Sequence, residues 1–394
     1  MTMQRSKQPR RSRSPQSVVL ALLCSALFTF AAVSVLTQTR PRARDLGIAV
    51  GVYPVGARNA ITDVDGVRVG HTTLVEGEQV RTGVTAILPH GGNLFQDKVA
   101  GAVFVGNAFG KLAGSTQVNE LGTIETPIVL TNTLSVGTAM DAVVRYTIGQ
   151  PGNEQVRSVN ALVGETNDGG LNDIRGLHVT REHVIAAITS ATAGTVAEGT
   201  VGAGTGTVNY GWKGGIGTAS RTLPSERGGY TVGVLTQTNF GGNLTISGVP
   251  IFRTLQPPRT RDNAAADEDA RASGDGSCML VVATDAPLDA RDLRRLAARA
   301  IFGLARTGSS YSNGSGDFAI AFSTSPQMRS RLNETAPRQR MVLPTDATSP
   351  LFEAALEATE EAVYNALFQA TTVRSAVGTA EAIPIERVRE LLKR

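Results

Sequence analysis

Short apolar runs separated by turn residues fill much of this chain, and they limit its fold more than any other feature. Between Asp45 and about Leu255 the runs alternate with Gly, Asn and Asp, and the 394-residue sequence holds 43 glycines without a triplet period. Short β-branched and aliphatic runs bounded by turn formers are typical of strands. We therefore expect strands at residues 67–69, 85–88, 102–105, 127–130 and 231–235.

Helical periodicity is clearest in the C-terminal part. Apolar residues repeat at helical spacing from Leu293 to Leu304, after Pro287 and before Gly308, which predicts a helix there. Ser349-Pro350 indicates the start of another helix. We also expect helices at 135–146, 180–190 and 385–392. No period of 20 to 50 residues appears, so a repeat array is excluded.

The basic charge of the chain belongs to its first segment. Residues 1–44 carry eight of the 38 basic residues and none of the 34 acidic ones, so the rest has 30 basic against 34 acidic residues. The main reason to propose a nucleic-acid partner is thereby removed. Within this segment an apolar run at 18–36 follows a basic start, the pattern of a signal peptide. We expect an exported protein, periplasmic or secreted, with an uncleaved membrane anchor as the alternative.

Cysteine and histidine are too sparse for common metal sites. Cys24 lies in the leader and leaves Cys278 alone, so no disulfide is expected within the mature chain. The four histidines are scattered and show no HExxH spacing. We expect no metal and no other cofactor.

The junction of Gly276 and Ser277 is the strongest candidate for chemistry. Residues 256–274 contain almost nothing to bury and predict a mobile surface loop, whereas an apolar run begins at Cys278. A serine hydroxyl can attack the carbonyl before it and exchange the amide for an ester, and glycine gives the backbone room to distort. The product is a serine with a free α-amine, which can serve as the base that the hydroxyl needs. Taken alone, the tetrapeptide Gly274-Asp-Gly-Ser277 is more typical of a simple turn, and the polar loop before it and the apolar run after it favour chemistry.

Several ordered motifs between Asn59 and Pro384 resemble one family, the L-aminopeptidase/D-amidase-esterases (DmpA) together with the β-peptidyl aminopeptidases (BapA). The matching segments are Asn59-Ala-Ile-Thr-Asp-Val, Val67-Arg-Val-Gly-His71, Thr131-Asn-Thr-Leu-Ser-Val-Gly137, Gly164-Glu-Thr-Asn-Asp-Gly169, Gly202-Ala-Gly-Thr-Gly206, Lys213-Gly-Gly-Ile-Gly-Thr-Ala-Ser-Arg221, Gly274 to Leu288, Arg306-Thr-Gly and Ser312-Asn-Gly-Ser-Gly-Asp317.

The resemblance implies an α+β fold, an αββα sandwich of the DmpA/ornithine acetyltransferase type, that matures by cleavage between Gly276 and Ser277. One hydrolase domain then comprises residues 45–276 and 277–394 after a leader at 1–44. The pieces stay associated and form a homo-oligomer. The implied substrates are short peptides, amides or esters with a free amino group.

The resemblance also implies roles for individual residues. Ser277 is placed as nucleophile and Asn239 as oxyanion donor. Ser315 and Asp317 are placed as the pair that orients the nucleophile and its amine. Glu165 is placed to hold the substrate ammonium. Asn167 stands where some members have a tyrosine, which leaves the side-chain preference open.

Other interpretations of these segments remain. Asn239 can belong to a plain turn, residues 312–317 to a Ser/Gly loop, and Glu165 and Asp168 to a solvated loop. The segment 202–206 resembles a phosphate cradle, but we favour close backbone packing near the site because no βαβ frame surrounds it. Cys278 is expected to be a buried strand residue, although a lone thiol beside the site can also modulate it.

Three other functions remain open. An acyl transferase of the ornithine acetyltransferase type shares the implied fold but uses a threonine nucleophile. A different self-processing amidase would accept blocked N-termini. A non-catalytic periplasmic binding protein would keep its chain intact.

Overall fold

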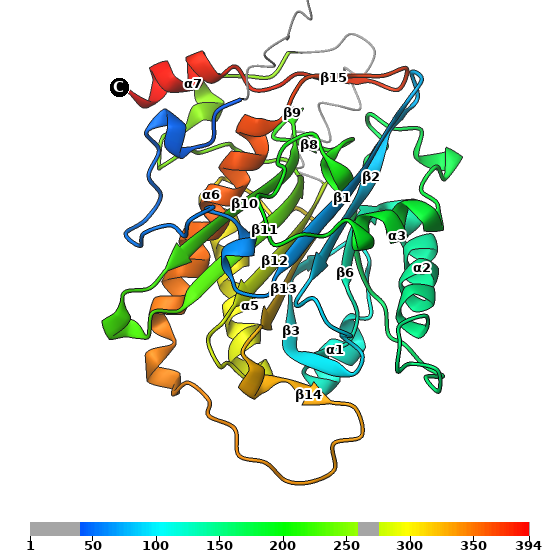
Figure 1. Ribbon diagram of the computed structural model, residues 1–394. Helices are drawn as coiled ribbons and strands as arrows, with labels where there is room; N and C mark the ends of the chain where they lie inside the picture. The colour runs from blue at the N-terminus through cyan, green and yellow to red at the C-terminus, as the bar shows by residue number, and fades with distance from the viewer. Residues whose placement is uncertain (1–39, 259–275, 394) are drawn as a thin grey trace, which may run out of the picture. The chain divides into compact units, whose positions relative to one another are not determined.

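Two β-sheets lie face to face in residues 40–258 and 276–393, the part of the chain that the computed structural model describes (Figure 1). The smaller sheet has the order β1 (Arg68–Glu76), β2 (Val80–Leu88), β6 (Ile128–Asn132), β7 (Leu162–Thr166) and β4 (Leu112–Ala113). The larger sheet has the order β10 (Gly215–Thr222), β11 (Thr231–Asn239), β12 (Gly276–Thr284), β13 (Ser315–Ser323), β3 (Asp97–Ala108) and β14 (Ser330–Arg331), and β5 (Thr123–Ile124) also pairs with β3. Two short pairs complete the strands: β8 (Val208–Asn209) with β9 (Trp212–Lys213), and β15 (Val373–Arg374) with β16 (Thr379–Ala380).

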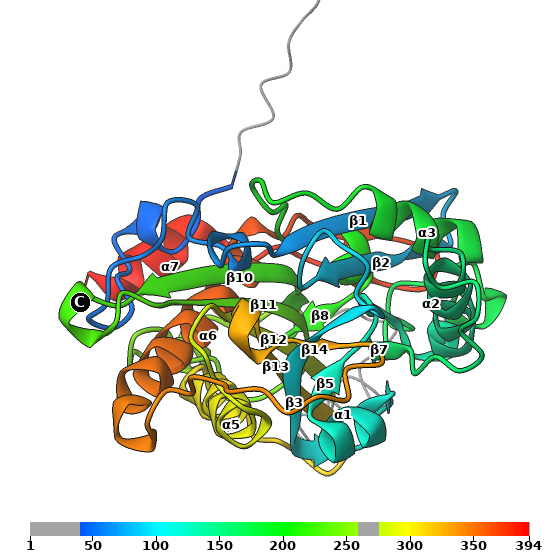
Figure 2. The same ribbon diagram turned by 60° about the horizontal axis from the view of Figure 1, so that its bottom comes forward.

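Helices cover the outer faces of both sheets (Figure 2). The smaller sheet is covered by α2 (Val136–Ile148) and α3 (Arg181–Thr189), and the larger by α5 (Ala290–Arg306) and α6 (Ser349–Gln369). The remaining helices are α1 (Ser115–Leu121) and α7 (Ile385–Leu392). The layers follow the order α, β, β, α, so the expected sandwich is confirmed.

Each expected strand and helix overlaps an observed one, whereas α1 was not predicted. The leader expected at 1–44 lies outside the described residues up to Thr39, and the loop expected at 256–274 lies outside them from residue 259. Within the described ranges no helix has the length and apolar character needed to cross a bilayer.

Strand β12 is buried on both faces. Leu280 and Val282 pack under the helices, while Met279 and Val281 pack between the sheets. Both sets are apolar, which explains why the strand appears in the sequence as one continuous apolar run. Residues before and after Gly276 thus build the same sheet, because β12 and β13 are flanked by β11 and β3.

A buried ion-pair network fixes α6 to the larger sheet. Arg221 on β10 is fully buried, and its guanidinium donates to Glu357 Oε2 at 2.9 Å and to Glu361 Oε2 at 2.7 Å. Glu357 also accepts the backbone N–H of Val52 at 2.7 Å, and Glu361 accepts Arg44 Nε at 3.0 Å. One buried cation therefore connects a strand, a helix and the N-terminal segment.

We expect Arg221→Met to lower the free energy of unfolding by about 3–5 kcal/mol, because it leaves the buried Glu357 carboxylate without its counter-ion and leaves Glu361 with Arg44 alone. Urea unfolding at neutral pH measures the change. Arg387→Met is the control, since Arg387 forms only an exposed pair with Glu390 and its loss should cost less than about 1 kcal/mol. Equal losses in both variants would contradict the role given to Arg221.

Candidate active site

Ser277 lies on an interior strand of the larger sheet, as the second residue of β12. It is in register with Asn239 on antiparallel β11 and with Gly316 on parallel β13. Side chains alternate along a strand, so Ser277 shares a face with Met279, whose sulfur packs against Gly164 of the other sheet. The nucleophile candidate therefore faces the space between the sheets, where it is 5% exposed.

Gly276 occupies a position that only glycine fits. Its φ is +152°, and a Cβ built there would lie 2.1 Å from the carbonyl oxygen of Asn239 and 2.6 Å from Cα of Phe240. Residues with a side chain rarely adopt such a backbone, and the space is closed by main chain, which cannot yield easily. The residue before Ser277 is therefore held in a conformation that brings β12 close against β11.

Asn239 stands directly across from the nucleophile candidate. The two residues are cross-strand partners, and such partners on one face have Cβ atoms about 4.5–5.5 Å apart. The side-chain Oδ1 of Asn239 accepts the backbone N–H of Val208 at 2.9 Å. This bond assigns the orientation of the amide, so Nδ2 is the atom that can donate toward negative charge beside Ser277. Asn239 is the last residue of β11, which favours a site role over a plain turn.

Ser315 and Asp317 belong to β13, so the Ser/Gly loop interpretation is wrong for these two residues. Ser315 is in register with Gly276 and Asp317 with Cys278, so the pair brackets Ser277 along the sheet. Strand alternation places both on the face toward the helices, opposite to the Ser277 side chain. Their placement suits an action on the backbone nitrogen of Ser277, and their orienting role stays a prediction.

Burial raises the pKa of the Asp317 carboxyl to about 6, and the nearby Ser315 hydroxyl partly offsets this shift. The two side chains do not meet hydrogen-bond geometry, and within the described ranges neither Ser315 Oγ nor the Asp317 oxygens have a partner. A buried carboxylate without a partner is costly, which makes it a candidate to receive a new cation such as a freed α-amine.

Glu165 approaches the nucleophile strand from the smaller sheet. It is the penultimate residue of β7 and is 1% exposed. Its Oε1 accepts a hydrogen bond from the N–H of Lys111 at 2.9 Å, and its Oε2 accepts one from the Thr133 hydroxyl. A Cβ built on Gly110 would lie 3.3 Å from Glu165 Oε1 and 3.2 Å from Cα of Gly316. Because Gly316 is the partner of Ser277, the carboxylate lies near the nucleophile, and the solvated-loop interpretation is wrong.

Asn167 has a different setting. It is exposed in the segment after β7, and its Oδ1 accepts the N–H of Gly169 at 2.9 Å. This contact belongs to a local turn. Its expected part in substrate binding stays a prediction.

The sequence analysis missed a buried Lys213, although Lys213 lies in a motif that was recognised. Its Nζ donates to the carbonyls of Gly204 and Gly214, both at 2.8 Å, and burial lowers its pKa to about 7. Asp168 is its nearby counter-charge, and burial raises the pKa of that carboxyl to about 6. Lys213 thus connects the glycine-rich segment to the hairpin formed by β8 and β9. Val208 in the same hairpin orients the Asn239 side chain.

The glycine-rich segment 202–206 packs closely, as expected. A Cβ on Gly204 would lie 2.5 Å from the nitrogen of Ile216, and one on Gly206 would lie 2.1 Å from the oxygen of Arg81. Cys278 is fully buried on the opposite face from Ser277, and burial raises the pKa of its thiol. The cysteine is therefore a neutral strand residue in the core.

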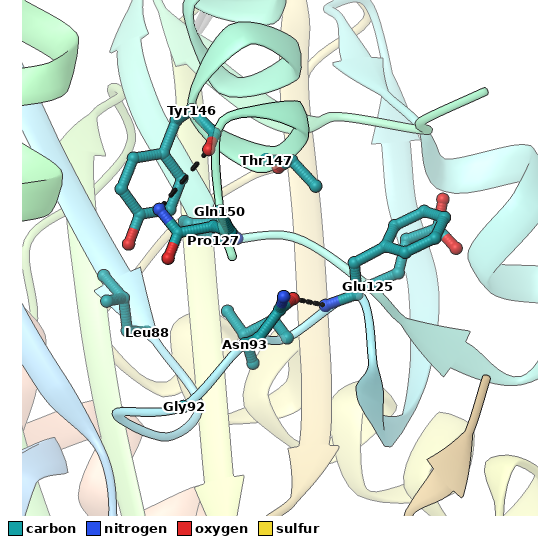
Figure 3. Close-up of a pocket in the computed structure, with 10 residues that line it drawn as sticks. Leu88, Gly92, Asn93, Glu125, Pro127, Tyr146, Thr147 and Gln150 are labelled. Carbon is teal, nitrogen blue, oxygen red and sulfur yellow. Dashed lines mark hydrogen bonds between the residues drawn. The ribbon is translucent and has the colours of Figure 1, made fainter. Parts of the chain in front are cut away.

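A surface pocket of about 260 Å³ lies elsewhere and offers no comparable chemistry (Figure 3). Its charged group, Glu125, is already paired with Lys98 at 3.4 Å and accepts the N–H of Asn160 at 2.9 Å. The lining residues are Leu88, Gly92, Asn93, Leu94, Phe95, Glu125, Pro127, Tyr146, Thr147 and Gln150. Among residues 40–258 and 276–393, no group of three His, Cys, Asp or Glu side chains is placed to hold a metal ion.

We expect Gly276→Ala to slow cleavage before Ser277 by at least about 100-fold, because the new Cβ meets main chain at 2.1 Å and the peptide must leave its strained position. The fraction of cut chain over time, followed by intact mass, measures the effect. Gly137→Ala is the control, since a Cβ on that exposed helix residue meets nothing within 4 Å. Cleavage of Gly276→Ala at the wild-type rate would contradict the argument.

Comparison with known proteins agrees with this geometry. Residues 59–380 match the model of peptidase family S58. The chain is 43% identical over 373 residues to the β-peptidyl aminopeptidase BapA of Sphingosinicella microcystinivorans, covering 90% of this chain and 92% of that protein.

Two solved structures have the same fold over 90% of this chain and 98% of their own. One is a β-aminopeptidase from a Burkholderia species, with a TM-score of 0.82 and 39% identity. The other is the L-aminopeptidase D-Ala-esterase/amidase of Ochrobactrum anthropi, described as a prototype of the serine aminopeptidases and a variant of the Ntn hydrolase fold, with a TM-score of 0.81 and 37% identity. A family match over most of the chain, relatives of this identity and a shared fold lead to one conclusion: this chain belongs to peptidase family S58, the serine aminopeptidases.

Proposed function

We propose that the chain cuts its own backbone between Gly276 and Ser277 and then works as an aminopeptidase with Ser277 as nucleophile. The observation that carries this proposal is the register of Ser277 with Asn239 directly after a glycine that no other residue can replace. A candidate nucleophile, a candidate oxyanion donor and a glycine with a positive φ meet there on two paired strands.

In the self-cleavage step, Oγ of Ser277 attacks the carbonyl carbon of Gly276. The C–N bond breaks, the nitrogen takes a proton, and an ester joins Gly276 to the serine oxygen. Water then hydrolyses this ester, leaving Gly276 with a carboxylate and Ser277 with a free hydroxyl and a free α-amine. Asp317, which lacks a partner in the described ranges, lies on the neighbouring strand to stabilise the new ammonium.

In the catalytic cycle, the α-amine takes the proton from Oγ as the oxygen attacks the substrate carbonyl. An ordinary α-amine has a pKa of about 7.7–8.0, which suits a base that works near neutral pH. Asn239 Nδ2 donates to the developing oxyanion, an interaction that contributes about 3 kcal/mol in comparable sites. The ammonium returns the proton to the leaving amine, and the same amine then activates water to hydrolyse the acyl ester.

Glu165 provides the requirement for a free N-terminus. Its carboxylate accepts hydrogen bonds from two neutral donors and is the group that would bind the substrate ammonium. The substrates are short peptides, amides or esters. Because relatives are named β-peptidyl aminopeptidase and β-aminopeptidase, we propose that β-amino-acid residues are among the N-terminal residues released.

The rest of the proposal concerns the chain as a whole. Residues 1–44 export the protein, residues 45–276 and 277–394 stay together as the two pieces of one domain, and several such units assemble. Strands from both pieces alternate in one sheet, which supports the proposal that the two pieces stay together. Exposed large apolar side chains such as Phe109 and Met341 give an assembly apolar surface to bury.

Intact mass and N-terminal sequencing of wild type and Ser277→Ala test the function. We expect two chains in wild type, one of them beginning Ser-Cys-Met-Leu, and a single chain in the variant. The cut enzyme should release N-terminal residues from unblocked substrates and leave N-acetylated ones intact. An uncut wild-type chain would refute the mechanism, and hydrolysis of acetylated substrates would refute the role of Glu165.

The pH profile tests Asp317. A carboxylate beside the α-amine favours the charged amine, so Asp317→Asn should lower the pKa of the amine. On the acidic limb of the kcat/KM profile, activity falls because the α-amine becomes protonated. In Asp317→Asn we expect this limb to move to lower pH by about one unit. Asp168→Asn is the control, because Asp168 has a similarly raised pKa but lies beside Lys213. An acidic limb that moves equally in both variants would contradict the assignment of Asp317 as the carboxylate beside the α-amine.

A further inference from the structure

We propose that Lys111 and Glu165 together form a two-charge subsite that selects N-terminal residues carrying a carboxylate on the same carbon as the ammonium, namely β-aspartyl residues. This inference rests on the proposed aminopeptidase function and names a substrate class for its site.

The two charges lie side by side at different depths. Lys111 Nζ is 3.8 Å from Glu165 Oε1, yet the Lys111 side chain is 56% exposed and that of Glu165 only 2%. The negative charge is therefore inside the site and the positive charge is at its edge. A substrate ammonium bound by the carboxylate would therefore have the ammonium of Lys111 as a neighbour.

Lys111 is not needed to stabilise Glu165. Both carboxylate oxygens already accept hydrogen bonds, one from the Lys111 backbone N–H and one from the Thr133 hydroxyl. A solvent-exposed lysine at 3.8 Å adds little to stability. The Lys111 ammonium is thus free to bind another anion without leaving Glu165 unpaired.

The segment that carries Lys111 also contacts β13, the strand that pairs with β12 beside Ser277. The N–H of Phe109 donates to the carbonyl of Ser315 at 3.1 Å, and Ala108 is in register with Gly316, the partner of Ser277. Gly110 then passes close to both Gly316 and Glu165, because a Cβ built on it would lie 3.2 Å from the first and 3.3 Å from the second. Lys111 therefore follows, within a few residues, the backbone that lies against the reaction centre.

The chemistry of the pair selects one kind of residue. A substrate with an ammonium alone meets the attraction of Glu165 but also the repulsion of Lys111. A carboxylate on the ammonium-bearing carbon reverses that repulsion, because each substrate charge then faces its opposite. A β-aspartyl residue has the same backbone from ammonium to scissile carbonyl as a β-alanyl residue, with that carboxylate added.

The test compares three substrates with one leaving group, p-nitroaniline: β-aspartyl, its α-carboxamide analogue and β-alanyl. We expect kcat/KM for β-aspartyl to exceed that for the carboxamide by about tenfold in self-cleaved wild type, mainly through KM. In Lys111→Met this ratio should fall to about one, and in Lys111→Glu below one. Lys111→Arg keeps the charge and should retain the preference.

Lys393→Met is the matched control, because it removes an exposed lysine at the end of α7 and should keep the wild-type ratio. Self-cleavage of each variant reports that it has folded. A wild-type ratio at or below one, or a ratio that survives in Lys111→Met, would overturn this inference, while β-alanyl hydrolysis would leave the aminopeptidase function intact. Failure of cut wild type on all three substrates would overturn both.

Discussion

The contact between the backbone of Gly276 and that of Asn239 is the constraint on which the site depends. A side chain at position 276 would clash with the backbone of β11, so the start of β12 packs closely against the end of β11. Ser277 therefore lies opposite Asn239. Register in a sheet is a property of whole strands, and a shift by one residue would turn Ser277 to the other face. The same close approach therefore also aligns Ser277, the proposed nucleophile, with Asn239, the proposed oxyanion donor.

Burial sets the electrostatics around this contact. Desolvation raises the pKa of Asp317 and of Asp168 and lowers that of Lys213, whereas Glu165 is held by two hydrogen-bond donors. Charges in such surroundings interact more strongly than at the surface. In the proposed mechanism, a new ammonium on Ser277 would face Asp317, and a substrate ammonium would face Glu165.

The framework also explains how the proposed cut can leave the fold intact. Strands β12 and β13 are enclosed by β11 and β3, which come from residues before Gly276, and α5 and α6 cover the same sheet. Arg221 further ties β10 and the N-terminal segment to α6 through Glu357 and Glu361. Hydrogen bonds and core contacts across the sheet do not require the peptide bond before Ser277.

Local pattern was sufficient for much of this protein. Turn residues and apolar periodicity predicted β1, β2, β3, β6, β11 and β12 and the helices from α2 onward. The abrupt change from a polar stretch to an apolar run marked Ser277 as a candidate for chemistry. The sequence could not show by its own periodicity that Ser315 and Asp317 lie in a strand, because buried polar residues break the apolar pattern. Nor could it show that Glu165 reaches the nucleophile from another sheet, or that Lys213 is fully enclosed. Those facts arise from pairing and packing between segments distant in the chain, and periodicity identifies the buried face of a strand but not the partner that covers it.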